Sequence, residues 1–161
     1  MTGNYSLRTM LRPDDIAAVR NLVSATGFFS TEEITIAGEL VEEALLKSTE
    51  AGYEFIFAES AEILIGYCCF GSIPLTRESF DMYWLAVQPA SQGSGLGRRL
   101  MSAAENTIRD MGGSRVYADT SSRPQYLPTR KFYETIGYQQ AAHLPDFYAP
   151  GDGKIIYCKT L

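Results

Sequence analysis

The centre of the chain reads Val87-Gln88-Pro89-Ala90-Ser91-Gln92-Gly93-Ser94-Gly95-Leu96-Gly97-Arg98. Three glycines fall within five residues, between an apolar run that ends at Val87 and a stretch with apolar residues at helical spacing. Glycines let the backbone N–H groups of a turn face one ligand, and a helix start adds unpaired donors and partial positive charge. The stretch therefore predicts a strand, an anion-binding loop and a helix, suited to a phosphate or pyrophosphate.

The loop alone does not identify its ligand, because glycine-rich turns also occur without one. A Walker-type phosphate loop requires a Lys followed by Ser or Thr, and no such pair follows these glycines. The dinucleotide fingerprint Gly-x-Gly-x-x-Gly fails as well, since its last position is Arg98 counted from Gly93 and Leu100 counted from Gly95. A nucleotide-dependent oxidoreductase is therefore the weaker alternative for this chain.

Patterns on both sides of the loop predict the remaining elements. Asp14 is expected to cap a first helix, which ends before Gly27, and Ser30-Thr31-Glu32-Glu33 to form a capping box for a second, closed by Gly52. Further helices are expected from Ser94 to Met111 and from Pro128 to Ile136. Strands are expected at 5–10, 53–59, 63–72, 79–87, 116–120, 138–142 and 154–160, and residues 144–153 form a turn-rich connection. The order β-α-α-β-β-β-α-β-α-β-β predicts one domain over residues 1–161, with a mixed sheet packed by helices.

The composition is that of an ordinary globular chain, with 161 residues, 45% hydrophobic and 20% charged. A net charge of −5 disfavours nucleic acid and anionic membranes as partners. No run approaches the roughly 18 apolar residues of a membrane-spanning helix, and residues 1–5 lack a signal-peptide pattern. With Cys68, Cys69 and Cys158, one histidine and no CxxC, we expect reduced thiols, no metal site and a cytoplasmic protein.

A second motif, Phe132-Tyr133-Glu134-Thr135-Ile136-Gly137-Tyr138, follows the loop by about one helix and one strand. The two motifs resemble those of the GNAT superfamily of N-acetyltransferases, which read Gln/Arg-x-x-Gly-x-Gly/Ala and Phe-Tyr-Glu-x-x-Gly-Phe/Tyr. The element order is similar to the family's over nearly the whole chain. The resemblance implies an α/β (α+β) fold with a mixed, mostly antiparallel sheet of six to seven strands and about four helices. It also implies an enzyme that transfers an acetyl group from acetyl-CoA, its cosubstrate, to a primary amine of a small molecule or peptide, by direct attack on the thioester.

The resemblance also implies roles for residues at both motifs. Backbone groups of Leu85, Ala86 and Val87 are expected to hold the pantetheine arm of the coenzyme, and the Val87 N–H to stabilise the oxyanion of the attacked thioester. The residues expected to bind the pyrophosphate are Gln92, Gly93, Ser94, Gly95, Leu96, Gly97 and Arg98. Tyr133 matches the family's general acid, which protonates or hydrogen-bonds the departing thiolate. A core aromatic is the competing interpretation, because Tyr133 shares a helical face with Phe132 and Ile136.

The acceptor amine must lose a proton, and Asp81 is the favoured base. It lies six residues before Val87, at a position similar to that of the glutamate base in the histone-modifying branch. A solvated aspartate at a strand start is the alternative interpretation. The weaker candidates for the base are Glu59, Glu78 and Asp119.

The sequence leaves the acceptor, the acyl-chain preference and the oligomeric state open, with a homodimer through sheet edges as one option. The segment Leu144 to Gly153 resembles a Tyr-Tyr-Pro-containing segment of the branch that acetylates ribosomal proteins. Tyr148 is therefore a candidate acceptor-site residue, and a lid without substrate contact is the competing interpretation. A non-catalytic acyl-coenzyme-A sensor is the second alternative function.

Overall fold

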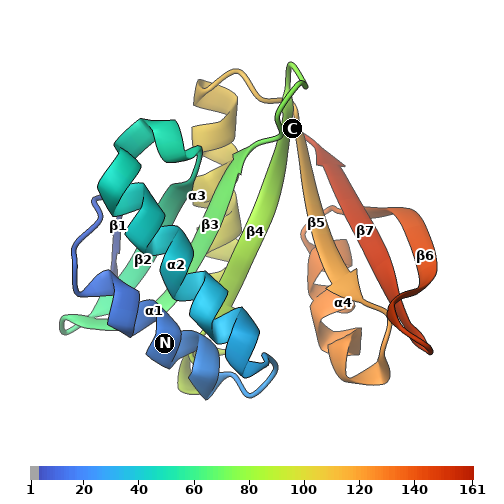
Figure 1. Cartoon of the computed structure of the whole chain (residues 1–161), viewed down its shortest axis with the longest axis horizontal. Helices are drawn as coiled ribbons and strands as arrows, with labels where there is room; N and C mark the ends of the chain where they lie inside the picture. Colours follow the sequence, from blue (N-terminus) through green and yellow to red (C-terminus); the bar gives the residue numbers. More distant parts are fainter. Residues whose placement is uncertain (1–3) are drawn as a thin grey trace. The chain divides into compact units, whose positions relative to one another are not determined.

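The computed structural model describes residues 4–161, which form seven strands and four α-helices (Figure 1). The strands are β1 (Ser6–Arg8), β2 (Glu54–Ser60), β3 (Ile63–Ser72), β4 (Ser79–Val87), β5 (Arg115–Ser121), β6 (Gln139–Ala149) and β7 (Asp152–Thr160). The α-helices are α1 (Asp15–Ala25), α2 (Thr31–Lys47), α3 (Leu96–Asp110) and α4 (Leu127–Thr135). Three short 3-10 turns join them, namely η1 (Ser48–Ala51), η2 (Pro89–Ser91) and η3 (Pro124–Tyr126). The predicted element order is confirmed, while residues 1–3, part of the segment tested for a signal peptide, lie outside the described residues.

The strands form a seven-stranded sheet in the order β1-β2-β3-β4-β5-β7-β6. Neighbours pair antiparallel for β1–β2, β2–β3, β5–β7 and β6–β7, whereas β4 and β5 run parallel. Helix α3 connects this parallel pair, since parallel strands need a crossover between them. The expected mixed, mostly antiparallel α/β sheet is confirmed.

The chain packs as two compact units that share β4 and α3. Unit 1 contains the residues up to Gly71 and Trp84–Asn106, and unit 2 contains Ser72–Tyr83 and Thr107–Leu161. Strand β4 therefore contributes its first half to unit 2 and its second half to unit 1. The single domain over residues 1–161 stays a prediction.

In unit 1, helices cover both faces of the strands (Figure 1). On one face, α1 and α2 bury a cluster that includes Val19, Val41 and Phe57, none of which is exposed. On the other face, the Cys68 thiol lies 3.9 Å from the carbonyl oxygen of Leu100 in α3. Cys68 and Cys69 are buried free thiols, as expected, and the Cys158 thiol is also free but partly exposed.

The two helix starts that were assigned capping residues differ in outcome. In α2 the predicted capping box is confirmed, because the Glu33 N–H donates to the Ser30 hydroxyl at 3.2 Å and the Glu33 carboxylate accepts from the Ser30 N–H at 2.7 Å. In α1, Asp14 occupies the predicted N-cap position, but its side chain makes no capping hydrogen bond. The next carboxylate, Asp15, accepts from the Arg12 N–H at 2.7 Å instead. Asp15 turns inward because a buried cation pairs with it.

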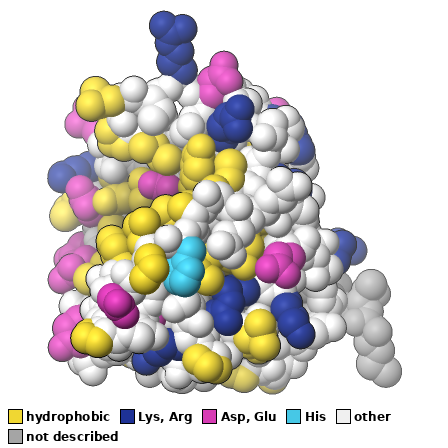
Figure 2. Space-filling view, turned by 90° about the vertical axis from the view of Figure 1, so that its right-hand side faces the viewer, with side chains coloured by type: hydrophobic (Ala, Val, Ile, Leu, Met, Phe, Trp, Pro, Cys, Tyr) yellow, Lys and Arg dark blue, Asp and Glu magenta, His cyan; other side chains and the backbone are white. Residues whose placement is uncertain are grey.

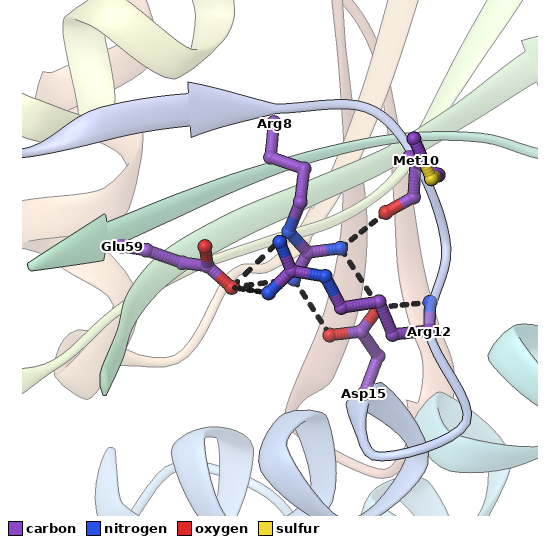
Figure 3. A network of polar contacts seen from close by, with 5 residues as sticks. All are labelled: Arg8, Met10, Arg12, Asp15 and Glu59. Carbon is purple, nitrogen blue, oxygen red and sulfur yellow. Dashed lines mark hydrogen bonds and ion pairs between the residues drawn. The ribbon is translucent and has the colours of Figure 1, made fainter. Parts of the chain in front are cut away.

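That cation is Arg8, at the centre of an ion-pair network (Figure 3). Its guanidinium donates to both oxygens of Asp15, at 3.0 and 2.8 Å, and to Glu59 at 2.6 Å. It also donates to the Met10 carbonyl and lies 4.5 Å from the centre of the Phe57 ring. The side chains of Arg8, Asp15 and Glu59 are only 10%, 5% and 15% exposed. The hydrogen bond from Arg8 lowers the pKa of Glu59, and the network ties β1 to α1 and β2.

The C-terminal hairpin is longer than predicted, because β6 continues to Ala149 and β7 begins at Asp152. The sequence reading of residues 144–153 as a turn-rich connection was wrong for most of this segment. Pro145 is tolerated because β6 is the last strand of the sheet, where a missing N–H breaks no ladder. The register shifts between Leu144 and Ala149, and Asp146 has a φ of 57° while its carboxylate accepts from the Gly151 N–H at 2.7 Å.

Replacing Arg8 by Met should lower the free energy of unfolding by about 3 kcal/mol, because it leaves the buried Asp15 without its cation and Glu59 with only the exposed Arg12, at 3.3 Å. Urea unfolding of the wild type and the variant measures this change. The matched control is Glu43→Gln, which removes an ion pair with Lys47 on the exposed face of α2 and should leave stability nearly unchanged. Equal effects of the two substitutions would contradict a stabilising role for the network.

The free energy of unfolding should depend on pH through Glu59, whose pKa is lowered in the folded state. Its contribution to stability is present above the unfolded-state value of about 4.3 and is lost as the pH falls through the lower folded-state pKa. The stability difference between wild type and Glu59→Gln should therefore be constant near neutral pH and shrink in acid.

Candidate active site

The glycine loop lies in unit 1, between the end of β4 and the start of α3. Gly93 and Gly95 have φ angles of 75° and 85°, in the left-handed region that glycine adopts without strain. A Cβ at either position would meet no atom within 4 Å, so backbone conformation, rather than space, requires the glycines. Leu96 then starts α3 and is 2% exposed, which fixes the helix against the unit 1 core.

Hydrogen bonds within the chain hold the loop in this shape. The Gln92 side-chain amide donates to the Val87 carbonyl at 3.1 Å, and the Ser94 hydroxyl donates to the Ser91 carbonyl at 2.6 Å. The Arg99 N–H donates to the Gly95 carbonyl at 3.1 Å and closes the first turn of α3. The first N–H groups of a helix have no partner within it, and they carry partial positive charge. The loop is thus preorganised to present backbone donors to an anion.

The structure brings the predicted pyrophosphate-binding residues together in one exposed loop. Gln92, Gly93, Ser94 and Gly95 are exposed, as is Arg98 in the first turn of α3. The predicted pantetheine-binding residues directly precede the loop, with Ala86 buried and Leu85 and Val87 partly exposed. The β4–β5 ladder pairs Ser79–Met82 with Arg115–Ala118. Leu85, Ala86 and Val87 therefore lie beyond the part of β4 that this ladder pairs.

Tyr133, the predicted general acid, lies on α4 in unit 2 and is 6% exposed. Its ring stacks on Tyr157 with centroids 5.7 Å apart and meets the edge of Tyr138 at 5.5 Å. The Tyr157 hydroxyl donates to Glu134 at 3.0 Å. Tyr133 is thus part of the aromatic core between α4 and β7. This packing is what the competing interpretation expects, and the catalytic role stays a prediction.

The start of α4 is fixed to the end of β5 by polar contacts. Arg130 donates to the carbonyls of Ser121 at 2.8 Å and Arg123 at 3.0 Å. Arg123 also pairs with Asp152 at 3.2 Å, and the Ser121 hydroxyl donates to the same carboxylate. Pro128 lies in the first turn of α4, as predicted, where its missing N–H leaves no helical bond unmade. These contacts fix the start of α4, and ring packing on Tyr157 and Tyr138 fixes the Tyr133 side chain.

Tyr133 and Asp81 belong to opposite faces of the unit 2 sheet. Met82, Ala118 and Tyr157 form one row across β4, β5 and β7, and all three are buried on the face that α4 covers. The preceding row is Asp81, Tyr117 and Cys158. Because successive residues of a strand point to opposite faces, this second row lies on the face away from α4.

A cluster of charges lies on the Asp81 face. Asp119 follows Tyr117 by two residues on β5, and its carboxylate pairs with the Lys154 ammonium of β7 at 2.6 Å. Burial raises the pKa of Asp81, the negative charge of Asp119 raises it further, and the positive charge of Lys154 opposes both. The sequence prediction missed Lys154, although alternation along β7 could have placed it on the face of Asp119.

The three weaker base candidates are each engaged in another contact. Glu59 belongs to the Arg8 network, and Glu78 accepts from the Ser114 hydroxyl at 2.6 Å. Asp119 forms the ion pair with Lys154. The role of Asp81 as the base stays a prediction.

Strand β6 borders the charge cluster with exposed aromatic side chains. Phe147 and Tyr148 are 53% and 50% exposed, and the Lys154 nitrogen lies 4.9 Å from the Phe147 ring centre. Figure 2, which looks onto the β6 edge, shows hydrophobic side chains gathered beside the single histidine of the chain. The hydrogen bond and the charge of Asp119 raise the pKa of Lys154, and Tyr148 makes a smaller contribution in the same direction. The candidate acceptor residue Tyr148 thus lies close to the cluster.

Two pockets of unit 1 contain none of the predicted site residues. One, of about 340 Å³, is lined by α1, the β2–β3 turn and Gln88, and the other, of about 320 Å³, by the end of α2, η1 and the start of β2. Among residues 4–161 no group of three or more His, Cys, Asp or Glu side chains is placed to hold a metal ion. No helix within the described part of the chain is long and apolar enough to cross a membrane.

Comparisons with known proteins confirm the family that the glycine loop and the second motif resemble. Residues 51–140 match the acetyltransferase (GNAT) domain, which covers more than half of the chain. A crystal structure from Desulfovibrio desulfuricans, assigned to the GNAT family of acetyltransferases, is 42% identical, covers 98% of this chain and 99% of that chain, and has a TM-score of 0.96. YncA of Salmonella typhimurium, solved with acetyl-CoA, is 21% identical over 99% of this chain and 95% of its own, with a TM-score of 0.77, and shows the same fold.

A third relative is the L-amino acid N-acyltransferase MnaT of Escherichia coli, 30% identical over 103 residues. The match covers 60% of this chain and 56% of MnaT, so the chain spans about half the length of the curated relatives it matches. The fold of residues 4–161, with its loop between β4 and α3, is the one found in these acetyltransferase structures. The chain belongs to the GNAT family of acetyltransferases.

The raised pKa of Asp81 predicts that its ionised carboxylate lowers stability near neutral pH. The penalty is present above the folded-state pKa and disappears as the pH falls through it, because the folded protein then holds the proton more tightly than the unfolded chain does. Asp81→Asn should therefore be as stable as the wild type at pH 7 or more stable.

Urea unfolding at pH 7 and below pH 4 measures this difference, which should shrink in acid. A carboxyl ¹³C NMR titration of Asp81 should have its midpoint above the ordinary value of about 3.9. An Asp81→Asn variant less stable than the wild type at pH 7 would show that the carboxylate stabilises the fold.

Proposed function

We propose that this protein is an acetyl-CoA-dependent N-acetyltransferase that acetylates the primary amine of a small molecule or peptide. The observation that carries the proposal is the preorganised loop from Gln92 to Arg98, with Gly93 and Gly95 in the left-handed region at the start of α3. Its backbone donors and the helix dipole suit the pyrophosphate of coenzyme A. Family membership supports the same ligand and disfavours a nucleotide-dependent oxidoreductase.

In the proposed reaction the amine nitrogen attacks the thioester carbonyl carbon directly. The new C–N bond forms, the C–S bond breaks, and coenzyme A leaves as a thiolate. The carbonyl oxygen becomes negative during the attack, and a backbone N–H at Val87 is the proposed donor to it. One such donor is typically worth about 3 kcal/mol of barrier lowering.

Two proton transfers complete the proposed reaction. Asp81 takes the proton of the attacking amine, directly or through a water molecule, and the raised pKa of its half-buried carboxyl makes it a better base than an exposed aspartate. Tyr133 hydrogen-bonds or protonates the thiolate. An ordinary tyrosine has a pKa of about 10 and a thiol about 8.5, so full transfer is uphill by roughly 2 kcal/mol. The role we propose for the Tyr133 hydroxyl is a hydrogen bond to the thiolate, which requires no full proton transfer.

For the acceptor we propose a small primary amine, with L-amino acids as the first class to test. The Escherichia coli relative is named as an L-amino acid N-acyltransferase. The Asp81 face supports an amine, because its two carboxylates and one ammonium, from Asp81, Asp119 and Lys154, sum to a net negative charge. Acetyl-CoA is the proposed cosubstrate, and no metal ion takes part in the proposed steps.

Gly95→Ala should weaken acetyl-CoA binding about tenfold, because the new side chain disfavours the left-handed backbone that aims the loop donors. Isothermal titration calorimetry measures the dissociation constant. The matched control is Gly27→Ala, after α1, where φ is 74° and a Cβ also meets no atom within 4 Å. Both variants incur the same kind of backbone strain. If the wild type shows no saturable binding, or both variants bind as it does, the loop is not the coenzyme site.

Tyr133→Phe should lower kcat about a hundredfold and leave the dissociation constant of acetyl-CoA within twofold, because only the proton donor is lost. Release of the coenzyme A thiol with a panel of L-amino acids, peptides and other primary amines measures turnover. Tyr138→Phe is the control, since it removes a hydroxyl from the adjoining buried ring. Unchanged kcat in Tyr133→Phe would reduce Tyr133 to a core aromatic. Saturable acetyl-CoA binding without turnover of any amine would identify a non-catalytic acyl-coenzyme-A sensor.

A further inference from the structure

The ion pair between Asp119 and Lys154 lies beside Asp81 and takes no part in the steps proposed above. Asp81 is the register partner of Tyr117, and Asp119 stands two residues further along the same face of β5. Adjacent strands lie about 4.8 Å apart and residues two apart on one strand about 6.6 Å, so the Cα atoms of such diagonal neighbours are about 8 Å apart on one face. Lys154 comes from the next strand, where it is the register partner of Ser121, and its ammonium reaches back to Asp119 at 2.6 Å.

The surroundings hold Lys154 as a fixed, protonated cation. Its side chain is 21% exposed, its ammonium lies 4.9 Å from the Phe147 ring centre, and the hydrogen bond to Asp119 raises its pKa. Asp119 is 40% exposed, so the pair lies at the border between the sheet face and solvent. A partly exposed ion pair contributes little to folding stability, so stability alone does not explain this arrangement.

We propose that Asp119 and Lys154 are positioning residues that set the pH at which Asp81 takes the proton of the acceptor amine. The inference rests on the proposed role of Asp81 as the base and names the two residues that act through it. Lys154 favours the ionised carboxylate of Asp81, and Asp119 disfavours it. The pair also orients Lys154, so that its charge stays at one distance from Asp81.

Other titratable groups border Asp81 and must stay constant in the test. Tyr117 is its partner on β5, Cys158 continues that row on β7, and Tyr148 acts on Lys154 from β6. The pKa of Tyr117 is raised, mainly by Cys158, and a tyrosine with a raised pKa stays neutral well above the pH range in which a carboxyl titrates. Asp119 and Lys154 are the two charged groups that shift the pKa of Asp81, and they shift it in opposite directions.

The test uses the fact that the two partners act on Asp81 in opposite directions. Lys154→Met removes a positive charge and should raise the Asp81 titration midpoint by about half a pH unit or more. Asp119→Asn removes a negative charge and frees Lys154, and should lower the midpoint by a similar amount. Lys154→Arg keeps the charge and should stay close to the wild type. Both charge-removing variants break the same ion pair, so a purely structural role predicts equal effects.

The measurements are the carboxyl ¹³C titration of Asp81 and the acid limb of the pH profile of kcat/KM, in the full-length protein. Opposite shifts of both, with Lys154→Arg near wild type, would support the proposal. Equal midpoints in the four proteins, or shifts of one sign in both charge-removing variants, would overturn it. A failure of Asp81 itself is recognised separately, because Asp81→Asn would then keep the acid limb of the wild type.

Discussion

Alternation along β4, β5 and β7 is the constraint on which the candidate chemistry depends. Hydrogen-bonded register places Asp81 beside Tyr117 and Met82 beside Ala118, so neighbouring residues serve different faces of one sheet. The row with Tyr157 is buried under α4, where Tyr157 stacks on Tyr133, whereas the row with Asp81 stays partly open and borders Asp119 and Lys154. A one-residue shift in the register of β4 would move Asp81 to the face under α4 and Met82 to the open face.

Features that depend on neighbouring residues could be predicted from the sequence. The loop between β4 and α3 was predicted because glycine spacing and a helix start are local signals, and the left-handed φ angles of Gly93 and Gly95 agree with it. The capping box of α2 was predicted for the same reason, since Ser30 and Glu33 are three residues apart. The element order and the mixed sheet followed from periodicity, which reports burial on one face of each element.

Features that depend on distant residues could not be predicted. Asp15 replaces Asp14 as the inward carboxylate because Arg8 and Glu59 surround it, and Glu59 is far along the chain. The Asp119–Lys154 pair joins two strands, and neither residue carries a local signal of the other. The sequence predicted that this strand ends at Ala142, because Pro145 and Asp146 are typical of turns. The position of β6 at the edge of the sheet allows both residues within a strand. The roles of Tyr133 and Asp81 remain predictions, because geometry alone shows position and not turnover.

The position of β6 has a consequence for how the chain can vary. Strand β6 is the last strand of the sheet, beside β7, and its Phe147 and Tyr148 side chains are half exposed. Substitutions there change an exposed surface and break no second ladder. The glycine loop belongs to unit 1, so β6 can diversify while the backbone conformation of Gly93 and Gly95 is retained.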